Sequence, residues 1–262
     1  FNKNLEVILM KLKNSKYLLL ALLVASSVGL SACGQKTEEK AATQTEEKTG
    51  ETKVAEVKAM KGDELAKIEA DKKEKENYLV IDVRSPEEYK AGHLKFAINM
   101  PIDTFEADYK KIEAFKDKDV VLYCNSGKKS AKAAEVLVNN GFQKVYNADG
   151  VKQFKYELVT FESKMGTDFI QDIKGGKAGL VIDAREAKDF EAGSFDKAVN
   201  IMPDDFESKK SSLPTDKNTA IYVFCYSGNK SATVAESLTK EGYTNVVNSL
   251  DGTKEIDFGF SK

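Results

Sequence analysis

Short apolar runs alternate along the chain with segments whose apolar residues recur at helical spacing. Residues 78–83 (YLVIDV) and 120–123 (VVLY) are nearly continuous apolar runs, a pattern typical of parallel strands that are buried on both faces. Residues 85–88 (SPEE) combine an N-cap serine, a proline at the first helical position and a capping-box glutamate. Strands that alternate with helices predict an α/β fold, in which a parallel sheet is flanked by helices.

The same pattern places the remaining elements. Further strands are expected at 54–60, 96–100, 144–147, 180–184 and 220–224, and further helices at 62–70, at 104–115 and after Ser130 and Ser231. Gly92 is expected to end the short helix that starts after Ser85, and Gly141 and Gly242 to end the two longer helices.

The pattern occurs twice. The string YLVIDVRSPEEYKAGH returns as GLVIDAREAKDFEAGS, and an apolar run followed by C-x-x-G-x-K-S occurs in both halves. Four aligned pairs are each 101 positions apart: Asp82 and Asp183, Arg84 and Arg185, Gly92 and Gly193, and Cys124 and Cys225. A duplication with this period predicts two small domains, at residues 54–155 and 156–262.

Cys124 and Cys225 each stand where a predicted strand passes into a helix. Loop N–H groups and the positive end of the helix converge at such a point and stabilise a thiolate, and Lys128, Lys129 and Lys230 add positive charge. We therefore expect two reactive thiols with depressed pKa values. The alternative is that both are buried apolar residues at the ends of core strands; recurrence of the whole string favours the reactive interpretation.

The N-terminal residues predict export. Lysines follow Met10, an apolar run spans 17–29, and LSAC occupies 30–33, the order found in a secretory signal peptide. Residues 1–32 are expected to be that peptide, with Met10 as its start. The alternative of a transmembrane helix is disfavoured because the apolar segment is short of the ~20 residues that span a bilayer.

LSAC resembles the lipobox of bacterial lipoproteins. The resemblance implies that Cys33 carries lipid, rather than being a free or disulfide-bonded cysteine, and that the protein is extracytoplasmic and lipid-anchored to a bacterial membrane. Residues 33–53 contain no bulky apolar side chain and are expected to form a disordered tether.

Charge and cysteine content exclude several classes of function. The net charge is −2 and no basic stripe is present, so a nucleic-acid partner is not expected. With Cys33 lipidated, the two remaining cysteines lie in separate domains and leave no pair for a structural disulfide. His93 is the only histidine, which excludes a cysteine–histidine dyad common to both repeats and disfavours a metal cluster; a structural role for His93 is preferred to catalysis. No cofactor is expected.

Residues 54–262 resemble a tandem of rhodanese-like sulfurtransferase domains. The resemblance depends on IDVRSPEEYKAGHLKFAINMP, on the CNSGKKS loop and on the NADG turn. It implies six-residue loops at 124–129 and 225–230, with Cys124 and Cys225 as nucleophiles. Each cysteine would take sulfane sulfur from a donor such as thiosulfate and pass it, as a persulfide, to cyanide or a thiol. The implied substrate-binding residues are Asn125, Ser126, Gly127, Lys128, Lys129 and Ser130, and Tyr226, Ser227, Gly228, Asn229, Lys230 and Ser231.

The loops also depart from related patterns. Cysteine phosphatases need an arginine six positions after the cysteine, where this chain has Ser130 and Ser231, so phosphatase activity is disfavoured. Rhodanese-like enzymes that use thiosulfate often have arginine at loop positions two and six. Here those positions hold Asn125 or Tyr226, and Lys129 or Lys230. Lysine keeps the charge without the guanidinium fork, so a persulfide or polysulfide donor is also considered.

The two repeats are not equivalent. Tyr226 is expected to cover Cys225 in part, and Ser194 replaces His93 in the second repeat, so Cys124 is the preferred nucleophile. The aspartate–arginine pairs, Asp82 with Arg84 and Asp183 with Arg185, are interpreted as buried ion pairs that shape each domain rather than as substrate contacts. The competing function is a non-catalytic module that senses sulfur or redox state or binds a partner. The sequence identifies no protein acceptor.

Overall fold

The computed structural model describes residues 55–260, which belong to one compact unit of the chain. The predicted signal peptide at 1–32, the lipidated Cys33 and the tether at 33–53 lie outside the described residues. Among the residues that are described, none of the helices has the length and apolar character needed to cross a membrane.

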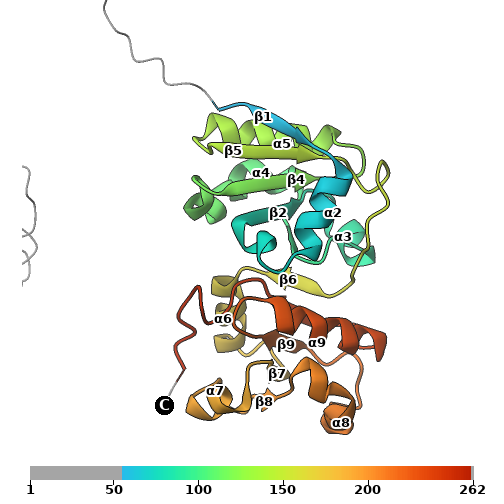
Figure 1. The fold of residues 1–262 in the computed structure, drawn as a ribbon, viewed down its shortest axis with the longest axis vertical. Helices are drawn as coiled ribbons and strands as arrows, with labels where there is room; N and C mark the ends of the chain where they lie inside the picture. The colour runs from blue at the N-terminus through green and yellow to red at the C-terminus, as the bar shows by residue number, and fades with distance from the viewer. Residues whose placement is uncertain (1–54, 261–262) are drawn as a thin grey trace, which may run out of the picture. The chain divides into compact units, whose positions relative to one another are not determined.

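Each repeat contains a five-stranded, all-parallel sheet, which confirms the predicted fold class (Figure 1). In the first repeat the strand order is β1-β5-β4-β2-β3. The strands are β1 (Val57–Met60), β2 (Tyr78–Asp82), β3 (Ala97–Asn99), β4 (Asp119–Tyr123) and β5 (Lys144–Ala148). The strand that precedes Cys124 is thus central in the sheet.

The second repeat has the matching order β6-β10-β9-β7-β8. Its strands are β6 (Glu162–Lys164), β7 (Leu180–Asp183), β8 (Val199–Asn200), β9 (Ile221–Phe224) and β10 (Val246–Ser249). Its helices are α6 (Gly166–Lys174), α7 (Ala187–Ala192), η3 (Pro203–Asp205), α8 (Phe206–Lys209), η4 (Lys210–Ser212) and α9 (Asn229–Lys240). Cys225 follows central strand β9, as Cys124 follows β4.

Helices cover both faces of the first sheet (Figure 1). They are α2 (Gly62–Ala70), η1 (Glu74–Asn77), α3 (Pro86–Ala91), α4 (Ile102–Asp108), η2 (Tyr109–Phe115) and α5 (Lys128–Asn139). Leu65 of α2 packs with Val80 and Val121 on one face, whereas Leu137 of α5 packs with Leu122 on the other. Alternate residues of one strand therefore face opposite cores, as the apolar runs predicted.

The expected single helix at 104–115 divides into α4 and the 3₁₀ helix η2, and Ile112 has non-helical angles (φ −108°, ψ 18°). Tyr109, Ile112 and Phe115 recur every three residues, the period of a 3₁₀ helix, and all three pack against the same core. The apolar spacing was compatible with both helix types.

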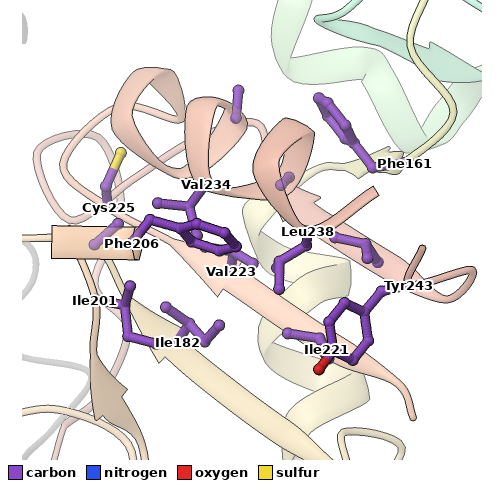
Figure 2. Close-up of a cluster of buried hydrophobic side chains, with 14 of the residues drawn as sticks. Phe161, Ile182, Ile201, Phe206, Ile221, Val223, Cys225, Val234, Leu238 and Tyr243 are labelled. Carbon is purple, nitrogen blue, oxygen red and sulfur yellow. The ribbon is translucent and has the colours of Figure 1, made fainter. Parts of the chain in front are cut away.

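In the second repeat, one core lies between the sheet and α9 (Figure 2). Val234 and Leu238 of α9 pack with Ile182, Ile221 and Val223 of the strands. This packing fixes the N-terminal end of α9 beside the end of β9, where Cys225 lies.

The two repeats also share packing. Phe96, from the first repeat, belongs to the same buried cluster as Phe161 and the core of the second. His93 forms an antiparallel bridge with Val159, and the Ser163 N–H donates to the Tyr89 hydroxyl at 3.1 Å. The first repeat therefore supports the second through buried contacts.

Candidate active site

Cys124 lies between the end of β4 and the start of α5. Gly127 adopts a left-handed conformation (φ +75°), which favours glycine, and the chain enters α5 at Lys128. The helix begins earlier than the sequence suggested, so Ser130 lies in its first turn and its hydroxyl faces back towards the cysteine.

The Cys124 sulfur is surrounded by hydrogen-bond donors. Ser130 Oγ lies 3.4 Å from the sulfur. Burial acts to raise the pKa of the Cys124 thiol, but the Ser130 hydroxyl and the N–H groups of Ser130, Ser126 and Lys129 outweigh it, so the pKa is lower than that of an ordinary cysteine. The thiolate, the nucleophilic form, is thus favoured at this position.

Both cysteines are nevertheless buried, at 1% exposure each, and both belong to core clusters. The two interpretations are therefore compatible: each cysteine is buried in a core cluster, and the Cys124 sulfur is at the same time surrounded by hydrogen-bond donors. Figure 2 shows the Cys225 sulfur at the margin of its cluster, directed away from Ile201 and Ile182.

The second loop repeats the geometry of the first. Gly228 is left-handed (φ +76°), α9 starts at Asn229, and Ser231 Oγ lies 3.4 Å from the Cys225 sulfur. In both repeats, the residue that replaces the phosphatase arginine is thus a hydroxyl donor to the thiol.

The side chains around the first loop leave it open. Asn125 Nδ2 donates to Glu88 Oε1 at 2.6 Å, and this hydrogen bond is the main cause of the lowered pKa of Glu88. Glu88 also completes the capping box of α3 with Ser85. Lys128 and Lys129 are exposed, and neither has an ion-pair partner among the described residues. They present free positive charge beside Cys124.

The second loop is more enclosed and more acidic. The Tyr226 hydroxyl donates to Asp189 and accepts from the Glu186 N–H at 3.2 Å. Lys230 is paired with Glu186, so part of its charge is neutralised. The predicted loop residues are brought together in both repeats, but their charges differ.

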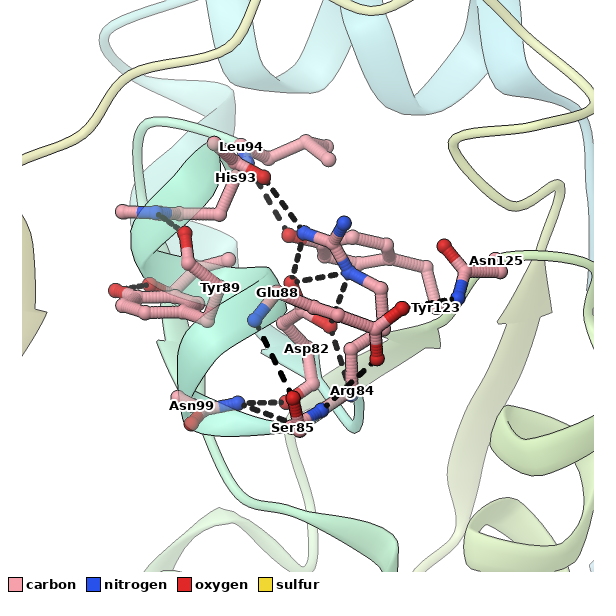
Figure 3. A network of polar contacts seen from close by, with 12 residues as sticks. Asp82, Arg84, Ser85, Glu88, Tyr89, His93, Leu94, Asn99, Tyr123 and Asn125 are labelled. Carbon is pink, nitrogen blue, oxygen red and sulfur yellow. Dashed lines mark hydrogen bonds and ion pairs between the residues drawn. The ribbon is translucent and has the colours of Figure 1, made fainter.

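The aspartate–arginine pairs form buried ion pairs at the end of the strand beside each cysteine. Figure 3 shows the pair of the first repeat. Arg84 Nη2 donates to Asp82 Oδ2 at 2.6 Å and to the Gly92 carbonyl at 2.7 Å. Arg185 makes the same contacts with Asp183 and Gly193. Their charges are satisfied within each pair, and the arginines link the strand ends to the turns at Gly92 and Gly193.

His93 is fully buried and stacks on Tyr89, with 3.5 Å between ring centroids. Its Nδ1 lies 2.8 Å from the Tyr89 carbonyl oxygen. Burial lowers the pKa of His93 to about 4. No residue of either cysteine loop is among its hydrogen-bond partners in the described structure.

Sequence reasoning did not identify two supports of the first loop. Asn147 Oδ1, 2.6 Å from Ser130 Oγ, shares the single Ser130 hydroxyl proton with the Cys124 sulfur, and Asn147 Nδ2 donates to the Gly127 carbonyl at 3.2 Å. Gly150 lies directly against the loop backbone, and the following N–H groups of Val151 and Lys152 donate to the carbonyls of residues 124 and 125, both at 3.0 Å. Both supports belong to the NADG turn, and the available signal was its Asp-Gly pair, which recurs as Asp251-Gly252.

Among residues 55–260, no group of histidine, cysteine and carboxylate side chains is arranged to hold a metal ion. A parallel α/β domain in which a cysteine ends a central strand and is followed by a left-handed glycine and a helix occurs twice, and this arrangement indicates the class of protein. The sequence matches the rhodanese-like domain family at residues 64–155 and again at 165–256. The chain belongs to this sulfurtransferase-type family, as a tandem of two such domains.

Curated relatives match over one domain only. The tRNA uridine(34) hydroxylases of Cronobacter sakazakii and Escherichia coli are 40% identical, over 74 and 76 residues respectively. These matches cover 27% and 28% of this chain and 21% and 22% of the relatives. The chain thus spans about a fifth of the length of the curated relatives it matches.

Solved structures give similar matches. A rhodanese from E. coli is 35% identical, with 31% of this chain and 96% of that chain covered and a TM-score of 0.30. A 3-mercaptopyruvate sulfotransferase from E. coli is 19% identical, with 74% and 98% covered and a TM-score of 0.33.

Replacing Ser130 with alanine is expected to raise the pKa of Cys124, because a hydrogen-bond donor to the thiolate is lost. The fraction of thiolate at neutral pH then falls, and the midpoint of the iodoacetamide alkylation profile moves to higher pH. Ser126→Ala is the matched control, since Ser126 acts on the sulfur through its N–H. An unchanged midpoint in Ser130→Ala would contradict the assignment.

Proposed function

We propose that the protein is a sulfurtransferase that moves sulfane sulfur through a persulfide on Cys124, with Cys225 as a second acceptor. The observation that carries this proposal is the set of donors around the Cys124 sulfur: the Ser130 hydroxyl and three backbone N–H groups. Donors placed in this way stabilise an anionic sulfur before and after it accepts a second sulfur atom.

The reaction divides into two displacements. In the first, the cysteine thiolate attacks the outer sulfur of the donor and a new S–S bond forms. The bond from that sulfur to the rest of the donor breaks, and its electron pair leaves with sulfite or with a thiolate. In the second, cyanide or an acceptor thiolate attacks the outer sulfur of the persulfide, and the cysteine thiolate is released. No external oxidant or reductant is needed.

Charge distinguishes the donors that suit the two loops. Lys128 and Lys129 favour an anionic donor such as thiosulfate at Cys124, although lysine lacks the bidentate grip of arginine. At Cys225, Glu186 and Asp189 lie beside the loop and would repel a dianion. A donor of lower charge, such as an organic persulfide, suits the second loop better.

The competing function is a non-catalytic module that senses sulfur or redox state or binds a partner; the absent arginines favour it. The tRNA hydroxylation of the curated relatives is not proposed for this chain, because the match covers one domain of those proteins.

Lipid anchoring at Cys33, after removal of residues 1–32, remains part of the proposal and rests on the LSAC string. Such an anchor would place the catalytic domains outside the cytoplasm, on a membrane surface. Mass spectrometry of membrane-extracted protein should find a diacylglyceryl group on Cys33; an unmodified Cys33 with residues 1–32 still attached would contradict the anchor.

The test of the sulfurtransferase function is mass spectrometry of the protein after exposure to thiosulfate or polysulfide. A gain of one sulfur atom on the Cys124 peptide is expected, together with its loss on addition of cyanide and release of thiocyanate. Cys124→Ser and Cys225→Ser assign each added sulfur to one residue. If neither cysteine gains sulfur and no transfer is measured, the non-catalytic module is the better account.

A further inference from the structure

The two cysteine loops differ in what covers them. In the first loop, Ser126, Lys128 and Lys129 are exposed. In the second, Ser227 is buried at 9% exposure and Gly228 is buried. Asn229 Nδ2, in the same loop, donates to the Lys72 carbonyl at 3.1 Å. A segment of the first repeat therefore packs against the loop that holds Cys225.

Lys75 is the buried residue of that segment, at 7% exposure. Its Nζ donates to the Ser227 carbonyl and lies 3.5 Å from the Leu250 carbonyl oxygen. The Phe96 ring lies beneath the ammonium group, 4.7 Å from its centroid. The ammonium group is thus held between the cysteine loop and the turn that follows β10.

The charge of Lys75 has no carboxylate partner within ion-pair distance among the described residues. Burial lowers the pKa of Lys75, while the negative charges of Glu76, Glu255, Cys225 and Asp251 act in the opposite direction. A buried cation without a direct counter-ion is costly, and an anion that forms nearby reduces this cost. The Cys225 thiolate is one such anion.

We propose that Lys75 is a positioning residue that the first repeat supplies to the second site: it fixes the Ser227 carbonyl and places a positive charge against the loop that holds Cys225. This inference rests on the proposed function, because that function requires Cys225 to be present as a thiolate or as its persulfide. It also gives a reason for the second loop to function with Lys230 already paired to Glu186. The second site is then complete only when the two repeats are docked.

The test compares the full-length protein with Lys75→Met and Lys75→Gln. Both variants remove the charge, and glutamine keeps a hydrogen-bond donor. The alkylation rate of each cysteine by iodoacetamide is followed against pH, with peptide mass spectrometry reporting Cys124 and Cys225 separately in one sample. Lys73→Met is the matched control, because Lys73 is an exposed lysine just before the same 3₁₀ helix.

Both Lys75 variants are expected to slow alkylation of Cys225 at pH 7 roughly fivefold to tenfold, because the positive charge beside its loop is removed, and to move the midpoint of its alkylation profile to higher pH. Cys124 and the Lys73→Met protein should keep the parent midpoints. An unchanged Cys225 midpoint in either variant overturns the proposal, and so does an equal shift at Cys124, which would indicate general loosening. Alkylation needs no sulfur donor, so failure of sulfur loading in the parent would remove the proposed function without deciding the role of Lys75.

Discussion

Replacing Gly150 with alanine is expected to slow alkylation of Cys124 at least tenfold and to lower the free energy of unfolding by about 3 kcal/mol. A Cβ atom at this position would lie 2.3 Å from the Asn125 carbonyl carbon and 2.5 Å from the Cys124 carbonyl oxygen. These are backbone atoms of the cysteine loop, which a rotamer change cannot move aside. The loop would have to shift, and the donors that meet at the sulfur would separate.

The chain offers a matched control in Gly141→Ala. Gly141 has a positive φ (+91°), and a Cβ there would meet nothing within 4 Å. Its substitution is expected to cost about 1 kcal/mol from backbone strain alone and to leave the alkylation rate of Cys124 unchanged. Urea unfolding and alkylation kinetics measure the two effects. Equal alkylation rates in Gly150→Ala and the parent would show that the turn does not hold the loop in place.

The same turn recurs in the second repeat. A Cβ on Gly252 would lie 2.0 Å from the Tyr226 carbonyl carbon, and the Thr253 N–H donates to the Cys225 carbonyl at 3.1 Å. The glycine of the Asp-Gly pair is therefore explained in both repeats by close packing of one backbone segment on another. Its sequence signal was visible, whereas its contact with the cysteine loop was not.

Much of the fold could be predicted because its signals are local. The bounds of α2 agree with the predicted helix, and the capping box of Ser85 and Glu88 forms as expected. The apolar runs at 78–83 and 120–123 became β2 and β4. The structure differs from the prediction at η2, where the same apolar spacing fits an α-helix and a 3₁₀ helix. It also differs at β3, which ends at Asn99, one residue before the predicted end.

The site was predicted in part for the same reason. Cys124 and its loop form one continuous segment, so the sequence brings these residues together. Asn147 and Lys75 contact the cysteine loops from distant positions in the chain, and local sequence patterns do not predict such contacts. Lys75 lies in a polar stretch, EKEN, which by composition resembles exposed surface, and it contacts Ser227, 152 positions away in the chain. Only the docking of the two repeats shows that it is buried.

Replacing Asp82 with alanine is expected to lower the free energy of unfolding by about 3–5 kcal/mol, because Arg84 would keep a buried charge without its partner. Asp82 and Arg84 are 0% and 5% exposed. Asp82 Oδ1 also accepts from the Arg84 N–H at 2.9 Å, so the substitution leaves a backbone donor unpaired as well. Chemical denaturation followed by circular dichroism measures the change.

The double variant Asp82→Val with Arg84→Met separates charge from packing. Removal of both charges eliminates the unpaired guanidinium, so the double variant should be more stable than Asp82→Ala, although the Arg84 N–H still lacks its acceptor. Because Asp82 pairs with Tyr123 in the sheet, and Tyr123 precedes Cys124, the single variant should also slow alkylation of Cys124. A cost below about 1 kcal/mol for Asp82→Ala would mean that solvent reaches the pair, and that the loop does not depend on a buried charge for its position.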